Sequence, residues 1–153
     1  MAVSKVVVKV LKLAHFDQSF ALPSYETAGA AGADVRACVA TPLTIKAGER
    51  VLVPTGLAME IPQGFEVQVR PRSGLSLKTS LMVVNAPGTI DSDYRGEVKI
   101  ILGNMGTKDE VINHGDRVAQ LVLAPVIQAN YVAEDALSET ARGAGGFGST
   151  GKK

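Results

Sequence analysis

The sequence has few of the residues that several common classes of protein require. It contains one cysteine, Cys38, so no internal disulfide can form. Cys38 lies in an apolar, strand-like run, where a free thiol behaves as a small hydrophobic residue rather than as a nucleophile. The two histidines, His15 and His114, have no clustered cysteines and no nearby serine suited to a triad. Neither a zinc site nor a triad hydrolase is therefore indicated.

A strong overall charge and a long apolar segment are also missing. Sixteen Lys and Arg residues oppose fifteen Asp and Glu residues, which gives a formal net charge of +1. No overall field therefore attracts nucleic acid or a membrane surface. The apolar N-terminal run is interrupted by Lys5, Lys9 and Lys12 and has no small-residue cleavage site, so it predicts neither a signal peptide nor a membrane span. We expect a cytoplasmic protein without nucleic-acid or membrane partners.

Short strands separated by turns dominate the pattern. No independent helix is predicted; only residues 74–80 and 134–140 could form a helical turn. Sixteen glycines and seven prolines supply the corners, which favours an all-β, compact, jelly-roll-like barrel or sandwich. We expect one domain over residues 1–140, followed by a flexible glycine-rich lid over residues 141–153. The strand candidates are residues 6–13, 35–39, 43–45, 51–53, 55–61, 65–70, 111–112, 118–126 and 130–132.

The most informative stretch is NAPGTIDSDYRGEVKIIL, residues 85–102. Its Asn-Ala-Pro-Gly cluster predicts a tight turn, and residues 83–84 and 96–100 have strand character, so we expect a β-hairpin with residues 89–94 near its tip. Asp91 and Asp93 beside Tyr94 could supply a general base, a contact to a metal-bound water, and a flat ring against a sugar or base. A solvated turn is the alternative, because Asp, Ser and Gly are good turn formers.

Three further segments carry polar groups at the ends of strands or inside them. In PRSGLS, Arg72 offers a charged fork, and the amides of Ser73 and Gly74 could point at an anion; an ordinary strand end is the alternative. Asp34 stands at the mouth of a strand, where it could equally cap a turn. Gln120 lies within an apolar strand, so its amide needs a neighbouring backbone group or a water as partner.

The C-terminal segment, RGAGGFGSTGKK, matches a GxGxxG pattern and nearly matches a phosphate-binding loop. Both need a strand before the glycines and a helix after them, which this segment does not have. Arg142, Phe147, Ser149 and Thr150 are instead suited to a lid over a phosphate and a base. Ordering such a lid costs about 1–2 kcal/mol per residue, so we expect it to close only over bound substrate.

Five segments together resemble, in the same order, the five motifs of the trimeric dUTPase family. They are AGADVRA (31–37), PRSGLS (71–76), NAPGTIDSDYRGE (85–97), GDRVAQLVLAPV (115–126) and RGAGGFGSTG (142–151). The resemblance implies a jelly-roll-like homotrimer that hydrolyses dUTP to dUMP and pyrophosphate. Each active site would be built from all three chains, with the C-terminal tail swapped onto a neighbour. Such an enzyme keeps uracil out of DNA and supplies dUMP for thymidylate synthesis.

The resemblance also implies a role for particular residues. Asp91 matches the general base that activates a water, and Asp34 and Gln120 match residues that touch waters on a Mg²⁺ held by the triphosphate. Ala33 departs from the family pattern, which often has a larger residue there. The residues that match substrate binders are Arg72, Ser73, Gly74, Asn85, Thr89, Ile90, Tyr94, Lys99, Arg142, Phe147, Ser149 and Thr150.

Two other functions remain open at this point. The related dCTP deaminase family shares the fold and uses a glutamate base on the cytosine ring, which directs attention to Glu97. The glycine-rich tail with Phe147 and the IDSDYRG stretch favour dUTPase over that family. The other is a non-catalytic trimeric β-module, which would have no reason to retain Asp91, Arg72 and the tail together.

Overall fold

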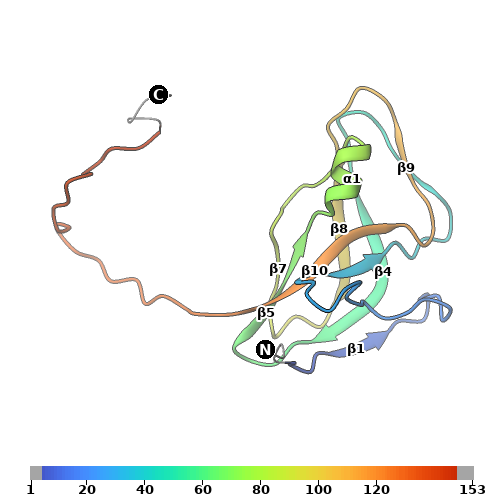
Figure 1. Ribbon diagram of the computed structural model, residues 1–153, viewed down its shortest axis with the longest axis horizontal. Coiled ribbons are helices and arrows are strands. Elements are labelled where there is room, and N and C mark those ends of the chain that lie inside the picture. The colour runs from blue at the N-terminus through green and yellow to red at the C-terminus, as the bar shows by residue number, and fades with distance from the viewer. Residues whose placement is uncertain (1–4, 148–153) are drawn as a thin grey trace.

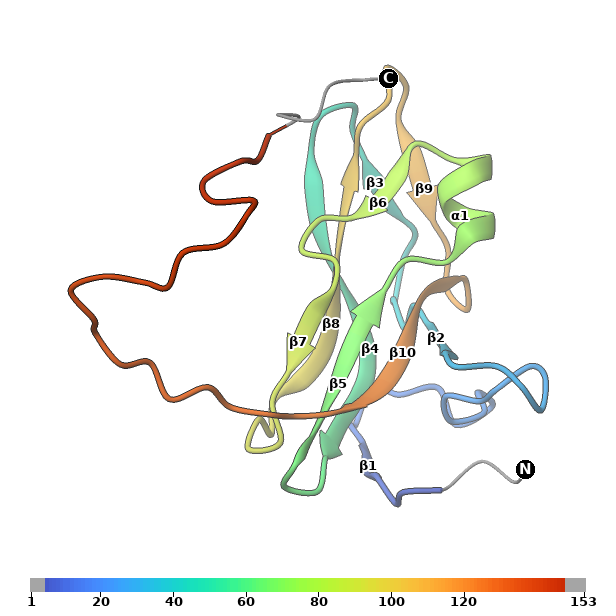
Figure 2. The same cartoon turned by 60° about the vertical axis from the view of Figure 1, so that its left-hand side comes forward.

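A computed structural model describes residues 5–147 of the chain, and the regular secondary structure of these residues is almost entirely antiparallel β-sheet (Figures 1 and 2). The first sheet contains, in spatial order, β1 (Lys9–Lys12), β4 (Arg50–Glu60), β8 (Glu97–Asn104) and β6 (Leu81–Val83). The second contains β2 (Ala33–Arg36), β10 (Arg117–Pro125), β5 (Phe65–Arg70) and β7 (Gly88–Ile90). A small third sheet pairs β3 (Leu43–Ile45) with β9 (Glu110–Ile112).

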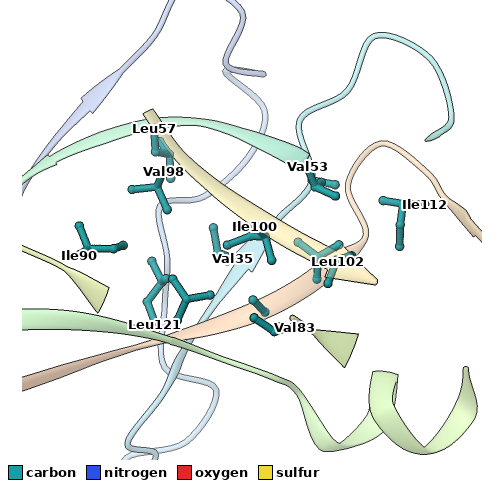
Figure 3. Packing of buried hydrophobic residues seen from close by; sticks show 14 of the residues in the cluster. Val35, Val53, Leu57, Val83, Ile90, Val98, Ile100, Leu102, Ile112 and Leu121 are labelled. Atoms are coloured by element: carbon teal, nitrogen blue, oxygen red, sulfur yellow. The ribbon is translucent and has the colours of Figure 1, made fainter. Parts of the chain in front are cut away.

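The hydrophobic core lies between the two larger sheets (Figure 3). Strand alternation explains which residues enter it, because successive side chains point to opposite faces. In β8, Val98, Ile100 and Leu102 are buried, and in β5, Val67 and Val69 are buried. Fully burying a side chain of this size contributes about 1.5–3 kcal/mol. The predicted all-β sandwich is therefore confirmed.

Two strands have the bounds that the sequence predicts, whereas two other predicted strands are joined into one. β3 and β5 span residues 43–45 and 65–70, as predicted. The strands predicted at 51–53 and 55–61 are one strand, β4, because Gly56 adopts a φ of 72° within a bulge instead of a turn. The register of β4 against β8 shifts there, between Pro54 and Ala58.

The prediction of a β-hairpin with strands at residues 83–84 and 96–100 is confirmed only in part. β6 pairs with β8, but β7 leaves that sheet and pairs with β5, with Val67 opposite Ile90 and Val69 opposite Gly88. Gly88 and Ile90 are buried, so the backbone of Gly88 and the side chain of Ile90 complete the core side of the second sheet. Residues 91–96 therefore cross from one sheet to the other.

The segment after β10 also differs from its prediction. The structure shows no strand at 130–132 and no helical turn at 134–140, and residues 126–144 are exposed. A lone strand lacks backbone partners, and a helical turn of this length is unstable without packing. The amide of Val126 still donates to the carbonyl of Gly64 at 2.9 Å. Beyond it the segment runs away from the sheets (Figures 1 and 2).

The predicted helical turn at residues 74–80 is present as α1 (Ser73–Lys78). Thr79 ends it, and its hydroxyl donates to the carbonyl of Leu75 at 2.7 Å. Within residues 5–147, no helix is long and apolar enough to cross a membrane.

Candidate functional site

A groove of about 400 Å³ opens beside the crossing segment, residues 91–96. Leu52, Val69 and Ile101 give it apolar walls from both sheets. Six residues predicted from the sequence to form a binding site also line it: Asn85, Thr89, Ile90, Asp91, Tyr94 and Lys99. An apolar cleft with a few convergent polar groups is the usual form of a small-molecule site.

Asp91 stands at the point where β7 ends and the crossing segment begins. Its backbone carbonyl accepts the amide of Tyr94 at 3.2 Å, which closes a turn. Its side chain is exposed and, among residues 5–147, takes part in no hydrogen bond to another residue. Both carboxylate oxygens are therefore available to a water in the groove. Asp93 is exposed as well, but it does not line the groove.

The ring of Tyr94 forms part of the groove wall and is held at its far end. Its hydroxyl donates to the backbone carbonyl of Glu97 at 3.0 Å. Arg95 closes the loop behind the ring, because its Nη1 donates to the carbonyls of Ser92 at 2.7 Å and Tyr94 at 3.1 Å. The ring therefore folds back across Gly96 instead of extending into solvent.

Glu97, at the start of β8, also lines the groove and connects three parts of the chain there. Its Oε1 accepts the amide of Gly56 at 2.8 Å and lies 2.8 Å from Nε2 of His15, and its Oε2 lies 3.6 Å from Nζ of Lys99. Burial raises the pKa of this carboxyl, but the hydrogen bonds from Gly56 and His15 and the charges of His15 and Lys99 outweigh that effect, so its pKa lies below the ordinary value. Glu97 is thus a charged structural group.

A second cluster gathers around Asp34, on β2. Asp34 lies directly opposite Gln120 of β10, so antiparallel pairing unites the two residues predicted to touch metal-bound waters. Oδ1 of Asp34 accepts Nε of Arg72 at 2.9 Å, and Oδ2 accepts Nη1 of Arg117 at 3.1 Å. Nε2 of Gln120 donates to the carbonyl of Pro71 at 2.8 Å, which leaves its amide oxygen free to accept.

Arg117 was not predicted from the sequence as a site residue. It is the arginine of the GDRVAQ motif and lies where the register of β10 against β2 shifts. Its backbone carbonyl also accepts Nη1 of Arg72 at 3.3 Å. Two of the five N–H groups of Arg72 are used in these bonds, so others remain for an anion. The only signal in the sequence was its position within the motif that contains Gln120.

Ser73 and Gly74 follow Arg72 at the start of α1, and both are exposed. The first backbone N–H groups of a helix have no intrahelical partner, so these amides can meet an anion beside Arg72. That Arg72, Ser73 and Gly74 bind phosphate stays a prediction. None of the three lines the groove.

The C-terminal residues reach neither the groove nor the Asp34 cluster. Nε of Arg142 donates to the carbonyl of Gly145 at 2.8 Å, and Phe147 is fully exposed. Figures 1 and 2 show this segment far from the sheets. Ser149 and Thr150 lie outside the described residues. The single chain therefore presents three separate groups of predicted residues: the groove, the Asp34 cluster and the tail.

A model of the dUTPase family matches residues 18–151. The deoxyuridine 5'-triphosphate nucleotidohydrolase of Roseobacter denitrificans is 61% identical over 136 residues, which cover 88% of this chain and 90% of that protein. The protein of the same name from Bdellovibrio bacteriovorus is 56% identical over 148 residues, which cover 97% and 98% of the two chains.

Solved structures of similar shape also include dUTPases. A mutant dUTPase of Staphylococcus bacteriophage 80alpha with dUpNHpp has a TM-score of 0.83 at 23% identity, and the match covers 96% of this chain and 99% of that one. A mutant dUTPase of the S. aureus phage phi11, described with a structural Mg(II) ion, has a TM-score of 0.73 at 22% identity over 86% and 98% of the chains. At this level of identity, these likenesses establish the fold.

Replacing Glu97 by Gln should change the pH dependence of stability. Because the folded pKa lies below the ordinary value of 4.5, the charged carboxylate stabilises the fold above that pH, and the contribution is lost as the pH falls through the folded pKa. Glu97→Gln should therefore unfold at a lower denaturant concentration than the parent at pH 7, and the difference should shrink at acid pH. Denaturant midpoints at pH 7, 4 and 3 would measure this.

The matched control is Glu134→Gln, an exposed carboxylate in the C-terminal segment, whose midpoints should follow the parent at every pH. A Glu97→Gln midpoint equal to the parent at pH 7, or a difference that stays constant down to pH 3, would contradict this role for the charge.

Proposed function

The chain belongs to the dUTPase family, and we propose that it hydrolyses dUTP to dUMP and pyrophosphate in a site centred on the groove. The observation that carries the proposal is the convergence on one groove of six residues, from Asn85 to Lys99, that the sequence singled out. In the cell this reaction keeps uracil out of DNA and supplies dUMP for thymidylate synthesis. A cytoplasmic location agrees with the lone, buried Cys38.

Asp91 is the general base in this proposal. Its exposed carboxylate accepts a proton from a water, whose oxygen forms a bond to the α-phosphorus while the bond from that phosphorus to the bridging oxygen breaks and pyrophosphate leaves. A positioned carboxylate of this kind contributes about 10² to 10⁴ in rate. The remaining acceleration comes from holding the triphosphate in line and stabilising its charge.

The groove has the features that uracil and deoxyribose require. β7 is the edge strand of its sheet, so backbone groups on its outer side have no neighbouring strand. Groups of Thr89, Ile90 and Asp91 can therefore pair with the polar edge of uracil, with the amide of Asn85 nearby. Lys99 borders the same pocket from β8. The ring of Tyr94 supplies a flat surface for the deoxyribose and leaves no room for a ribose 2'-hydroxyl.

The triphosphate is assigned to Arg72 and the amides of Ser73 and Gly74, and Asp34 and Gln120 would hold a Mg²⁺ bound to it through water molecules. The structure fits an ion held mainly by phosphate and water: among residues 5–147 no group of three or more His, Cys, Asp or Glu could cage it. Each carboxylate oxygen of Asp34 accepts one hydrogen bond from an arginine and has a lone pair left for a water. The amide oxygen of Gln120 can also accept a hydrogen bond from a water. When bound, the ion neutralises developing negative charge on the phosphates.

A homotrimer with shared sites would unite the three separate groups of residues. The C-terminal segment has exposed apolar side chains, with Ile127 at 95%, Tyr131 at 94% and Leu137 at 87% exposure. Such side chains favour burial against another surface. In this proposal residues 141–153 reach over a neighbour's groove, Phe147 stacks on uracil, Arg142 meets the γ-phosphate, and Ser149 and Thr150 contact the phosphates.

The deaminase alternative receives less support from the site. Its base would be Glu97, but this carboxylate is bonded to Gly56 and His15 and only 13% exposed, with a pKa below the ordinary value. A general base needs carboxylate oxygens that are free to accept a proton from the reacting group, and the bonds of Glu97 to Gly56 and His15 occupy one of its oxygens.

A four-nucleotide assay tests the function. With Mg²⁺ present, the protein should release pyrophosphate from dUTP and, within the same time, almost none from dTTP, dCTP or UTP. Ammonia measured in the same tubes reports deamination. Ammonia from dCTP would instead place the protein with the deaminases, and no product from any nucleotide would leave a non-catalytic module.

Replacing Asp91 by Asn should abolish most turnover without removing binding. The amide has the shape of the carboxylate but cannot accept the proton, so kcat should fall about 100-fold or more. Binding of dUMP, measured by calorimetry, should change little. Asp93→Asn is the matched control, because Asp93 is exposed two residues away and does not line the groove; its kcat should stay near that of the parent. Near-normal turnover in Asp91→Asn would refute the role of Asp91.

Mixing two inactive proteins tests whether sites are shared between chains. Asp91→Asn chains retain an intact tail, and chains that lack residues 142–153 retain Asp91. If each site takes Asp91 from one chain and the tail from another, subunit exchange should restore part of the dUTP hydrolysis. Mass spectrometry should confirm the mixed trimers, and mixed trimers without activity would be evidence against shared sites.

A further inference from the structure

The ring of Tyr94 occupies the space in which residue 96 would place a side chain if it were not glycine. A Cβ atom built on Gly96 would collide with the hydroxyl of Tyr94, and would lie 2.5 Å from Cζ and 2.9 Å from Cε2 of the same ring. Real Cβ atoms essentially never approach other atoms more closely than 3.0 Å. The ring of Tyr94 can therefore lie across residue 96 only because that residue lacks a side chain.

The backbone itself does not require glycine at this position. Among residues 5–147, the glycines with a positive φ are Gly48, Gly56, Gly64, Gly115 and Gly143, and Gly96 is not one of them. Alanine could therefore adopt the backbone conformation at residue 96 without strain. The space taken by the Tyr94 ring is the remaining constraint.

The ring rests on a rigid support. Its hydroxyl bonds to the backbone carbonyl of Glu97, and the Glu97 side chain is held by the amide of Gly56 and by His15. β8 continues directly from Glu97 into the core. The ring itself is 47% exposed, so it can swing into solvent if its place above residue 96 is filled. A methyl group there would displace the ring and leave the core intact.

We infer that Gly96 is a specificity-determining residue that acts through Tyr94: its missing side chain seats the ring against the sugar, and the seated ring excludes ribonucleotides. The inference rests on the proposed function, in which the groove binds the deoxyribose of dUTP. The Tyr94 ring in this position excludes nucleotides that carry a 2'-hydroxyl. The edge of β7, which faces the base, does not depend on it.

Gly96→Ala should therefore change one kind of selectivity and leave another unchanged. The ratio of kcat/KM for dUTP to that for UTP should fall about 10-fold or more, mainly through KM, because the seated ring no longer excludes the 2'-hydroxyl. The ratio for dUTP to dTTP should stay within about 2-fold, since the thymine methyl lies against another part of the groove. General damage to the fold would not separate the two ratios in this way.

Two further variants make the test specific. Gly29→Ala is the matched control, because Gly29 has no positive φ and no atom within 4 Å of an added Cβ; both of its ratios should match the parent. In a Tyr94→Ala background, Gly96→Ala should have no further effect on the ratio of dUTP to UTP. An unchanged ratio in a folded Gly96→Ala protein, or an equal effect in both backgrounds, would overturn the inference.

The position of the Tyr94 ring over Gly96 can also be tested without an activity assay. Tyr25→Phe and Tyr131→Phe leave Tyr94 as the sole tyrosine, and 3-fluorotyrosine then gives one ¹⁹F resonance from its ring. Gly96→Ala should move this resonance toward that of free fluorotyrosine, whereas Gly29→Ala should not. If the resonance does not move in Gly96→Ala, the inferred role of Gly96 is refuted even if the protein hydrolyses dUTP. If the resonance moves but the parent protein does not hydrolyse dUTP, only the proposed function is refuted.

Discussion

The groove depends on one constraint of sheet pairing: β7 bonds to β5, whereas β8, a few residues later, bonds to β4 and β6. The chain must therefore cross between the two sheets at residues 91–96. Because the flanking strands are anchored in the core by Ile90, Val98 and Ile100, the crossing segment has little freedom. Asp91 and Tyr94 are consequently held on a loop whose two ends are rigid, as a pre-organised site requires.

Side-chain bonds to the backbone then set the details that sheet pairing leaves open. Glu97 satisfies the amide of Gly56 at the bulge of β4 and, through its own carbonyl, holds the hydroxyl of Tyr94. Asp34 performs a similar task at the other cluster, where two arginines from different parts of the chain meet one carboxylate. Both carboxylates are mostly buried, and such groups orient neighbours well when every oxygen is paired. The two clusters thus use buried charge mainly for positioning.

The separation of the groove, the Asp34 cluster and the tail within one protomer has a functional consequence. Each group has only part of what a nucleoside triphosphate requires. The groove offers a general base and a nucleoside pocket, the Asp34 cluster offers charged groups, and the tail could close over both. In the proposed homotrimer, residues from several chains would bring these parts together. A tail that leaves its own sheets at Val126, with exposed apolar side chains along it, suits such an arrangement.

The sequence alone determined the all-β class and the bounds of β3 and β5, and it predicted the six residues that the structure gathers around one groove, because alternation and turn chemistry are local and the motifs are contiguous. Only the tertiary structure decided that β7 joins the opposite sheet, that Asp34 faces Gln120, and that Arg117 shares the carboxylate of Asp34. Such pairings join residues far apart in the chain, and their energies depend on which strands become neighbours. The need for glycine at residue 96 was likewise invisible in the sequence, since it arises from the position of the Tyr94 ring and not from the backbone conformation of residue 96 itself.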